Sequence, residues 1–170
     1  FPLLFPVLVF IAVVAAAAWL FDARATTVVV VVRHAETEVG TDPDPGLNVD
    51  GRERAARLAK MLSHARPVRG IDAIFSSELK RTQQTVTPLS ETLALPLNVV
   101  PSATWDELPS RILRGHRGEY VLVAGNTNTV PALVEALSGE KVELGEDEYD
   151  AMFIVFAPQI SRPKVVRLRY

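Results

Sequence analysis

The sequence lacks cysteine altogether, and it carries no excess of charge of either sign. Its 170 residues include 18 Lys and Arg against 20 Asp and Glu, which gives a formal net charge of −2. Without cysteine the chain has no disulfide framework, no thiolate nucleophile and no thiolate metal site. The balanced charge offers no cationic face for nucleic acid, so we expect no nucleic-acid partner.

Histidine is also scarce, and its three copies are scattered. His34, His64 and His116 lie far apart, and none has the spacing of a zinc-binding pair. The sequence therefore predicts no metal site. His64 falls at the end of a predicted helix, where the helix dipole favours a cation, so we assign it a structural role.

One long hydrophobic run, Leu3 to Phe21, opens the chain. A helix needs about 20 apolar residues to cross a bilayer, whereas a signal-peptide core usually has ~7–15. Length favours a membrane anchor with an exported domain, periplasmic or extracellular. The small-x-small segment Ala23-Arg24-Ala25 also resembles a cleavage site, and cleavage near Ala25 would release a secreted or periplasmic protein. We therefore expect residues 1–25 to be an anchor or signal segment and 26–170 to form one domain.

Five consecutive valines, Val28 to Val32, lead directly into Arg33 and His34. A continuous β-branched run is typical of a strand buried on both faces in the middle of a parallel sheet. Ligands of open α/β sheets bind outside the carboxyl ends of the strands. Arg33 and His34 therefore emerge where such a fold places its site.

Strand and helix patterns alternate along the rest of the chain. We expect helices near 50–64, 78–93, 105–116 (interrupted near Pro109) and 130–137, with Asp50 and Ser76 or Ser77 as caps of the first two. Further strands are predicted at 71–75, 97–100, 120–124, 152–156 and 165–168, the last at an edge. This order predicts a three-layer α/β/α sandwich on a mostly parallel sheet, preceded by an N-terminal hydrophobic helix.

Three strand ends offer polar groups that suit a phosphoryl group: Arg33 with His34, Arg81, and the turn 126–129. Two guanidiniums can hold phosphoryl oxygens, and a helix N-terminus adds backbone donors. A neutral imidazole at His34 can attack phosphorus with one nitrogen while the other keeps its proton in a hydrogen bond to backbone. The alternatives are a surface pair between Arg81 and Glu78, and an ordinary helix cap at 126–129.

The chain resembles the histidine phosphatase superfamily, the phosphoglycerate-mutase-like group, in four blocks that follow the family's order. RHAET (33–37) is similar to its R-H-G/A-E motif, LNVDGR (47–52) to L-x-x-x-G-R, and FSSELKRTQQT (75–85) to S-S-x-L-x-R-T-x-Q-T. GNTNTVP (125–131) resembles the G-H-S-N-T-x-P block of the small bacterial branch, which EYD (148–150) also fits.

This resemblance implies a phosphatase site that needs no cofactor. His34 would be the phosphorylated nucleophile, and Arg33 and Arg81 would bind the phosphate together with Asn126 and Thr127. The substrate would be a small phosphorylated molecule or a phosphoprotein. For the general acid, the nearest candidates by position are Asp106 and Glu107, which fit equally well as solvated residues in the first turn of a helix.

The family's second histidine is replaced by Asn126 in this chain. Asparagine keeps a donor but supplies no charge. By comparison with an oxyanion donor, the loss could cost ~3 kcal/mol, or roughly 100- to 1,000-fold in rate. Two hypotheses follow: a weakened phosphomonoester hydrolase, or a non-catalytic domain that binds phosphate or a phospholigand. A mutase ranks lower, because this short chain lacks obvious insertions that would exclude water.

Overall fold

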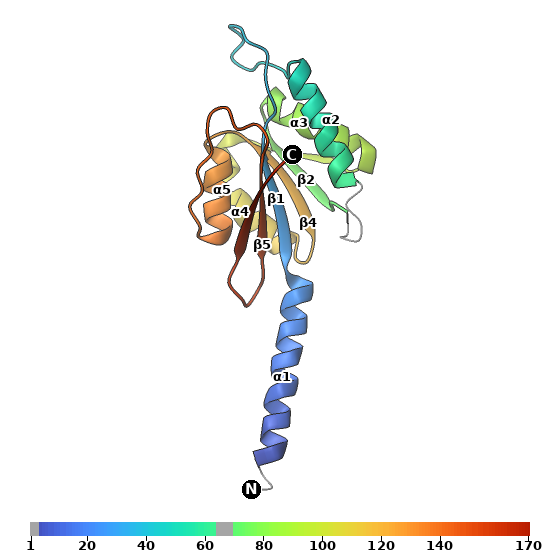
Figure 1. The fold of residues 1–170 in the computed structure, drawn as a ribbon, viewed down its shortest axis with the longest axis vertical. Helices are drawn as coiled ribbons and strands as arrows, with labels where there is room; N and C mark the ends of the chain where they lie inside the picture. The colour runs from blue at the N-terminus through green and yellow to red at the C-terminus, as the bar shows by residue number, and fades with distance from the viewer. Residues whose placement is uncertain (1–3, 64–69) are drawn as a thin grey trace.

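The computed structural model describes residues 4–63 and 70–170, so His64 lies outside the described residues. Figure 1 shows a compact α/β domain from which the long helix α1 projects. The elements follow the order α1 (Leu4–Ala25), β1 (Thr27–Arg33), α2 (Val49–Ser63), β2 (Ala73–Ser77), α3 (Lys80–Leu93), β3 (Leu97–Val100), the 3₁₀ helix η1 (Ser102–Glu107), α4 (Leu108–Gly115), β4 (Tyr120–Gly125), α5 (Thr129–Ser138), β5 (Ala151–Ala157) and β6 (Lys164–Arg169).

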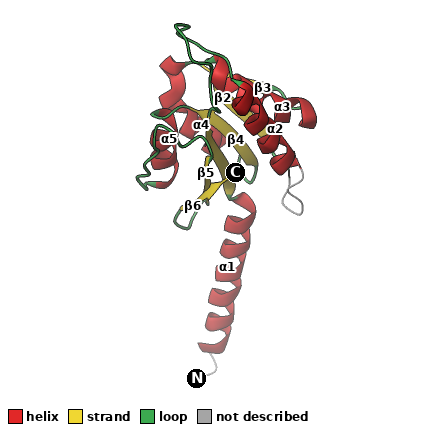
Figure 2. Cartoon of the chain, turned by 45° about the horizontal axis from the view of Figure 1, so that its top comes forward, coloured by secondary structure: helices red, strands yellow, loops and turns green. Residues whose placement is uncertain are grey.

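The sheet has six strands in the order β3-β2-β4-β1-β5-β6. The first four are parallel to one another, while β5 pairs antiparallel with β1 and β6 antiparallel with β5. Helices cover both faces (Figure 2). The predicted three-layer α/β/α sandwich is confirmed, with β6 at an edge as expected.

The central strand β1 is buried along its whole length. Val29 and Val31 belong to the core cluster under α4 and α5, whereas Val30 and Val32 belong to the cluster under α2 and α3. Successive side chains of a strand point to opposite faces, so a strand between two helical layers must be apolar at every position. This requirement explains the valine run.

Helix ends differ from the sequence prediction. Asn48, rather than Asp50, caps α2, because its Oδ1 accepts the backbone N–H of Gly51 at 2.8 Å. The start of α3 is capped from a distant loop: the Asp44 carboxylate accepts the Lys80 N–H at 3.0 and 3.1 Å. The side chain of Asp44, which is distant in the sequence, therefore caps α3, whereas the sequence predicts Ser76 or Ser77 as the cap.

The hydrophobic N-terminal run forms one helix, as predicted. Within α1, residues Phe5–Ala25 are long and apolar enough to cross a membrane, by length and composition only, and nearly all of them are exposed. Only Thr26 separates this helix from β1. The role of α1 as an anchor or signal segment stays a prediction.

Candidate active site

A cavity of about 370 Å³ lies where the carboxyl ends of β1 and β4 meet the start of α3. It is lined by Arg33, His34, Thr37, Arg81, Asn126, Thr127, Asn128 and Tyr149. All five residues that we expected to bind or attack phosphate therefore line one cavity. A larger cavity of about 580 Å³, beside Arg52 and Gln84, contains none of them.

His34 is held as a neutral imidazole. Its side chain is only 6% exposed, and its Nδ1 lies 2.8 Å from the carbonyl oxygen of Ala35. Because a carbonyl can only accept, Nδ1 carries the proton and Nε2 keeps its lone pair. Burial lowers the pKa of His34 to about 4, assisted by the charges of Arg33 and Arg81 and opposed by the Ala35 hydrogen bond. At neutral pH the ring is therefore uncharged.

Arg33 is clamped by the segment that precedes β5. The residue is only 6% exposed, and its Nη1 donates to the carbonyl oxygens of Gly145, at 3.1 Å, and Glu146. The centroid of the Tyr149 ring lies 4.2 Å from the guanidinium carbon. Among the described residues, Arg33 Nε is buried and has no hydrogen-bond partner. The clamp thus fixes the cation and leaves one donor unused.

Glu148 braces this clamp. Its Oε2 accepts the N–H of Gly145 at 2.8 Å, and its carboxylate pairs with Arg167 at 2.7 Å and Arg169 at 3.1 Å on β6. The Gly145 hydrogen bond and these guanidiniums lower the pKa of Glu148. Sequence reasoning missed both Tyr149 and Glu148 as site residues, and their only signal was the EYD block.

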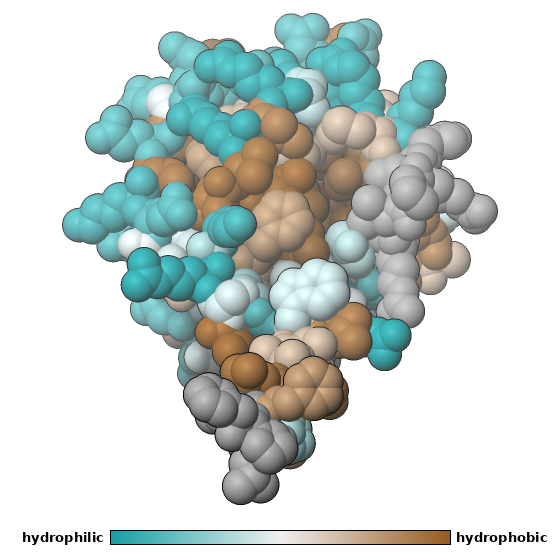
Figure 3. All heavy atoms as spheres, turned by 60° about the horizontal axis from the view of Figure 1, so that its bottom comes forward, coloured by the Kyte–Doolittle hydropathy of each residue, from teal (hydrophilic) through white to brown (hydrophobic). Residues whose placement is uncertain are grey.

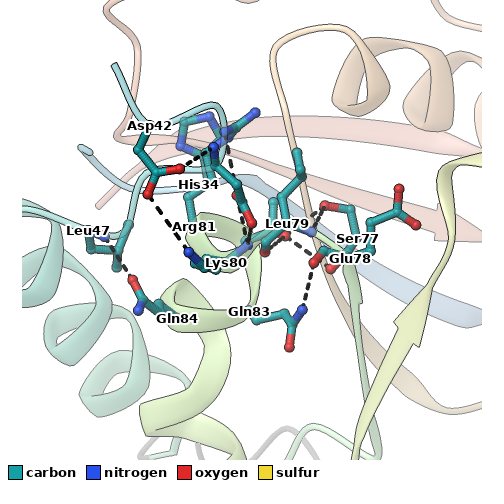
Figure 4. Close-up of polar contacts among 12 residues, drawn as sticks. His34, Asp42, Leu47, Ser77, Glu78, Leu79, Lys80, Arg81, Gln83 and Gln84 are labelled. Atoms are coloured by element: carbon teal, nitrogen blue, oxygen red, sulfur yellow. Dashed lines mark hydrogen bonds and ion pairs between the residues drawn. The ribbon is translucent and has the colours of Figure 1, made fainter. Parts of the chain in front are cut away.

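Arg81 lies in the first turn of α3, and its nearest acid is Asp44, with Nη1 3.8 Å from Oδ1. Glu78, the alternative partner, instead accepts the N–H and Oγ–H of Ser102 at 2.9 and 2.8 Å. In Figure 4, Arg81 lies close to His34 beside the loop that contains Asp42. Arg81 therefore belongs to the cavity wall rather than to a surface pair with Glu78.

Asn126 is both a helix cap and a cavity residue. Its Oδ1 accepts the backbone N–H groups of Asn128 at 3.1 Å and Thr129 at 3.0 Å, at the start of α5. Two N–H donors require the amide oxygen at this position, so the orientation of the amide is determined. The Oδ1 atom is therefore used by the cap, and the two N–H donors of Nδ2 are available to a ligand in the cavity.

Asp106 and Glu107 do not line the His34 cavity. Asp106 faces a separate cavity of about 230 Å³, together with Trp105, Pro109 and residues of α5. The structure therefore does not bring these carboxylates to the proposed nucleophile. Among residues 4–63 and 70–170, no group of three or more His, Cys, Asp or Glu side chains could hold a metal ion.

An α/β sandwich that brings a neutral imidazole and two guanidiniums to one cavity at the carboxyl ends of its parallel strands has the donors and the charge to accommodate an anion. The model of the histidine phosphatase superfamily (branch 1) matches residues 29–116. The match covers just over half of the chain, and the chain belongs to this superfamily. The matched region ends before Asn126, so the family model does not test that position. A comparison with curated proteins gave no match.

Solved structures share the fold. The protein histidine phosphatase SixA complexed with tungstate has a TM-score of 0.65 at 20% identity, with 84% of this chain and 96% of that chain covered. Phosphoserine phosphatase from Entamoeba histolytica has a TM-score of 0.62 at 12% identity, with 85% of this chain and 97% of that chain covered. A mycobacterial glucosyl-3-phosphoglycerate phosphatase has a TM-score of 0.61 at 16% identity, with 82% of this chain and 97% of that chain covered. At these identities the likeness concerns the fold alone.

Proposed function

We propose that this protein hydrolyses phosphomonoesters through a phosphohistidine on His34, with turnover weakened by Asn126. One observation carries the proposal: His34 is neutral, hydrogen-bonded to backbone through Nδ1, and shares a cavity with Arg33 and Arg81. The arrangement combines a nucleophile with an unprotonated nitrogen and two fixed positive charges.

The proposed reaction has two steps. His34 Nε2 donates its lone pair to phosphorus, the P–O bond to the substrate breaks, and the departing alkoxide takes a proton from solvent water. Water then attacks the phosphohistidine and releases a proton to solvent, the P–N bond breaks, and phosphate leaves while His34 returns to the neutral ring. Arg33 and Arg81 stabilise the charge on the phosphoryl oxygens in both steps.

Asn126 contributes less than a histidine would. Its Nδ2 can donate to a phosphoryl oxygen, but it brings no positive charge. Its Oδ1 is occupied by the two backbone N–H groups at the start of α5. We therefore expect phosphate binding to be retained better than turnover, with Thr127 as a further phosphate contact. The loss in rate corresponds to ~3 kcal/mol of transition-state stabilisation.

The second candidate is a non-catalytic domain that binds phosphate or a phospholigand. Asn126 favours it, because this side chain serves the helix cap and cannot titrate near neutrality. Asp106 and His34 also line different cavities, so no carboxylate is assigned as general acid. A mutase stays the weakest possibility.

Further parts of the proposal concern the location and the substrate. We propose that α1 anchors the protein in a membrane with an exported domain; cleavage near Ala25 is the alternative. Small phosphorylated molecules or phosphoproteins are the proposed substrates, in keeping with the small bacterial branch, whose G-H-S-N-T-x-P block resembles residues 125–131.

The test is turnover of p-nitrophenyl phosphate by the full chain in detergent, compared with His34→Ala and Asn126→His. Native activity that His34→Ala abolishes would support the enzyme, and activity gained only in Asn126→His would support the binding domain. Asn126→His also loses the cap of α5, so Asn126→Ala, which loses the same cap without adding an imidazole, serves as the control. A native chain that neither turns over nor binds vanadate would refute both candidates.

A further inference from the structure

The last turn of α1 is fixed to the turn that joins β5 and β6. Asp22 is the one acid of α1, and it is only 9% exposed. Its Oδ1 accepts the N–H groups of Gln159 at 2.7 Å and Ile160 at 2.8 Å. Its Oδ2 accepts the N–H of Ser161 at 3.1 Å and its Oγ–H at 2.6 Å. Four hydrogen bonds from one turn are more than a solvated carboxylate at a helix end requires.

A second turn of the domain packs on the same end of α1. Gly118 has a φ of +72°, and a Cβ at this position would lie 2.4 Å from the carbonyl oxygen of Arg24. Only glycine allows this approach. A hydrogen bond joins the same two segments: Thr27 Oγ1, at the start of β1, donates to the carbonyl oxygen of His116 at 2.9 Å. With two turns attached to it, α1 cannot swivel freely beneath the domain.

Four exposed cations belong to this junction or lie within three residues of its contacts at Gly118 and Ser161, and we call them the basic collar: Arg24, Arg117, Arg162 and Lys164. Among the described residues, none of the four has an acidic partner. The acids nearest in the chain are already engaged, since Asp22 binds the β5–β6 turn and Glu119 pairs with His116 at 2.7 Å. Ile160 is 65% exposed within that turn. The collar thus has unneutralised positive charge beside one apolar side chain.

We propose that the basic collar rests on the anionic headgroups of the membrane that α1 enters, with Ile160 at the boundary of the acyl chains. The inference depends on the proposed membrane anchor. Cations directly beside a membrane span are attracted to anionic lipid, and an exposed apolar side chain prefers the interface to water. Figure 3, viewed from this end, shows the hydrophobic side chains of α1 and hydrophilic side chains around the outline of the domain.

This arrangement determines where the active site lies relative to the bilayer. β1 leads from α1 to Arg33, and its seven residues span roughly 20 Å at about 3.3 Å per residue. The cavity with His34 is at the far end of this strand. The pocket therefore faces away from the membrane and meets phosphorylated soluble molecules or proteins rather than lipid phosphates of its own bilayer.

The native chain has no cysteine, so Ile160→Cys creates a single site for an environment-sensitive fluorophore such as NBD. The labelled full chain is reconstituted in vesicles of phosphatidylcholine, or of phosphatidylcholine and phosphatidylglycerol at about three to one. We expect a shift to shorter emission wavelength, and protection from acrylamide quenching, only in the anionic vesicles. NaCl at about 0.5 M should remove both effects by screening.

Two matched variants test the charges. Arg162→Ser with Lys164→Ser should lower the ratio of docked to undocked domain roughly 25-fold, at about fivefold per cation. Arg57→Ser with Lys80→Ser removes the same charge from exposed positions in α2 and α3 and should change nothing. A label at Pro163→Cys guards against a local effect of the Ile160 change.

Equal emission in both kinds of vesicle would overturn the proposal, as would a shift that neither salt nor the collar variant reduces. Failure of the full chain to enter vesicles would overturn it together with the anchor. The measurement uses no substrate, so a failure of the proposed phosphatase activity leaves it unaffected.

Discussion

Replacing Tyr149 with alanine should weaken phosphate binding, because its ring holds Arg33 in place. The guanidinium carbon of Arg33 lies 4.2 Å from the ring centroid, and the side chain is almost fully buried. Its remaining hydrogen bonds are both donated by Nη1, to the carbonyl oxygens of Gly145 and Glu146. Contacts at one nitrogen cannot fix the plane of the guanidinium, whereas the ring face can.

The size of the effect follows from the contact between cation and ring. Such contacts contribute about 0.5–1 kcal/mol at exposed sites and about 2 kcal/mol when desolvated. The burial of Arg33 places this contact in the upper part of that range, at about 1–2 kcal/mol. Since 1.4 kcal/mol corresponds to a factor of ten, we expect the affinity for phosphate or vanadate to fall roughly 5- to 30-fold.

Calorimetric titration of the full chain with orthovanadate measures this affinity without requiring turnover. Tyr149→Phe is the matched control: it keeps the ring face, loses the hydroxyl and should bind within about twofold of the native chain. Thermal unfolding of both variants verifies that each is folded. If Tyr149→Ala binds vanadate as tightly as the native chain, the ring does not position Arg33. A Phe variant as weak as the Ala variant would assign the effect to the hydroxyl instead.

Three further predictions concern the surroundings of the site. Glu148→Gln should loosen the segment that holds Arg33 and lower vanadate affinity by up to about fivefold in the same titration; an unchanged affinity would contradict the brace. Glu36→Gln breaks a pair with Arg54 that is largely buried and 2.5 Å long, so urea unfolding should show a loss of about 1–3 kcal/mol. Hydrogen bonds from Arg54 lower the pKa of Glu36, so this stability is present at neutral pH and is lost as pH falls through the lowered pKa. The pKa of His34 is about 4 in the folded chain, below its ordinary value of 6.5, so the unfolded chain takes up the proton first and stability should fall by about 3 kcal/mol from pH 6.5 to pH 4. Urea unfolding of His34→Gln should show a correspondingly smaller loss between the same pH values.

The fold class could be predicted from local patterns alone. The run Val28 to Val32 requires a strand covered on both sides, and the alternation of strands with amphipathic helices requires two helical layers. The rule that ligand sites lie at the carboxyl ends of the strands predicts that Arg33, His34 and Arg81 meet at one edge of the sheet. Each of these inferences depends on residues close together in the chain or on a general property of parallel sheets.

Contacts between distant segments could not be predicted in this way. Asp44 caps α3 from a loop that precedes α2, whereas the local sequence pattern predicts an adjacent serine as the cap. Gly145 and Tyr149 hold Arg33 although they are distant from it in the sequence, and neither residue type predicts a contact with an arginine. Periodicity describes which face of an element is buried, but it does not say which loop lies against which side chain.

The sequence by itself determined the order of the elements, the apolar N-terminal helix and the set of residues at the strand ends. Each of these depends on the hydrophobic pattern of residues that are close together in the chain. Only the tertiary structure decided what surrounds them. The neutral state of His34 follows from its burial, and the attachment of Asp22 to the β5–β6 turn follows from how the chain closes on itself. Both depend on desolvation and on contacts between residues far apart in the chain, which exist only once the sheet and its two helical layers have assembled.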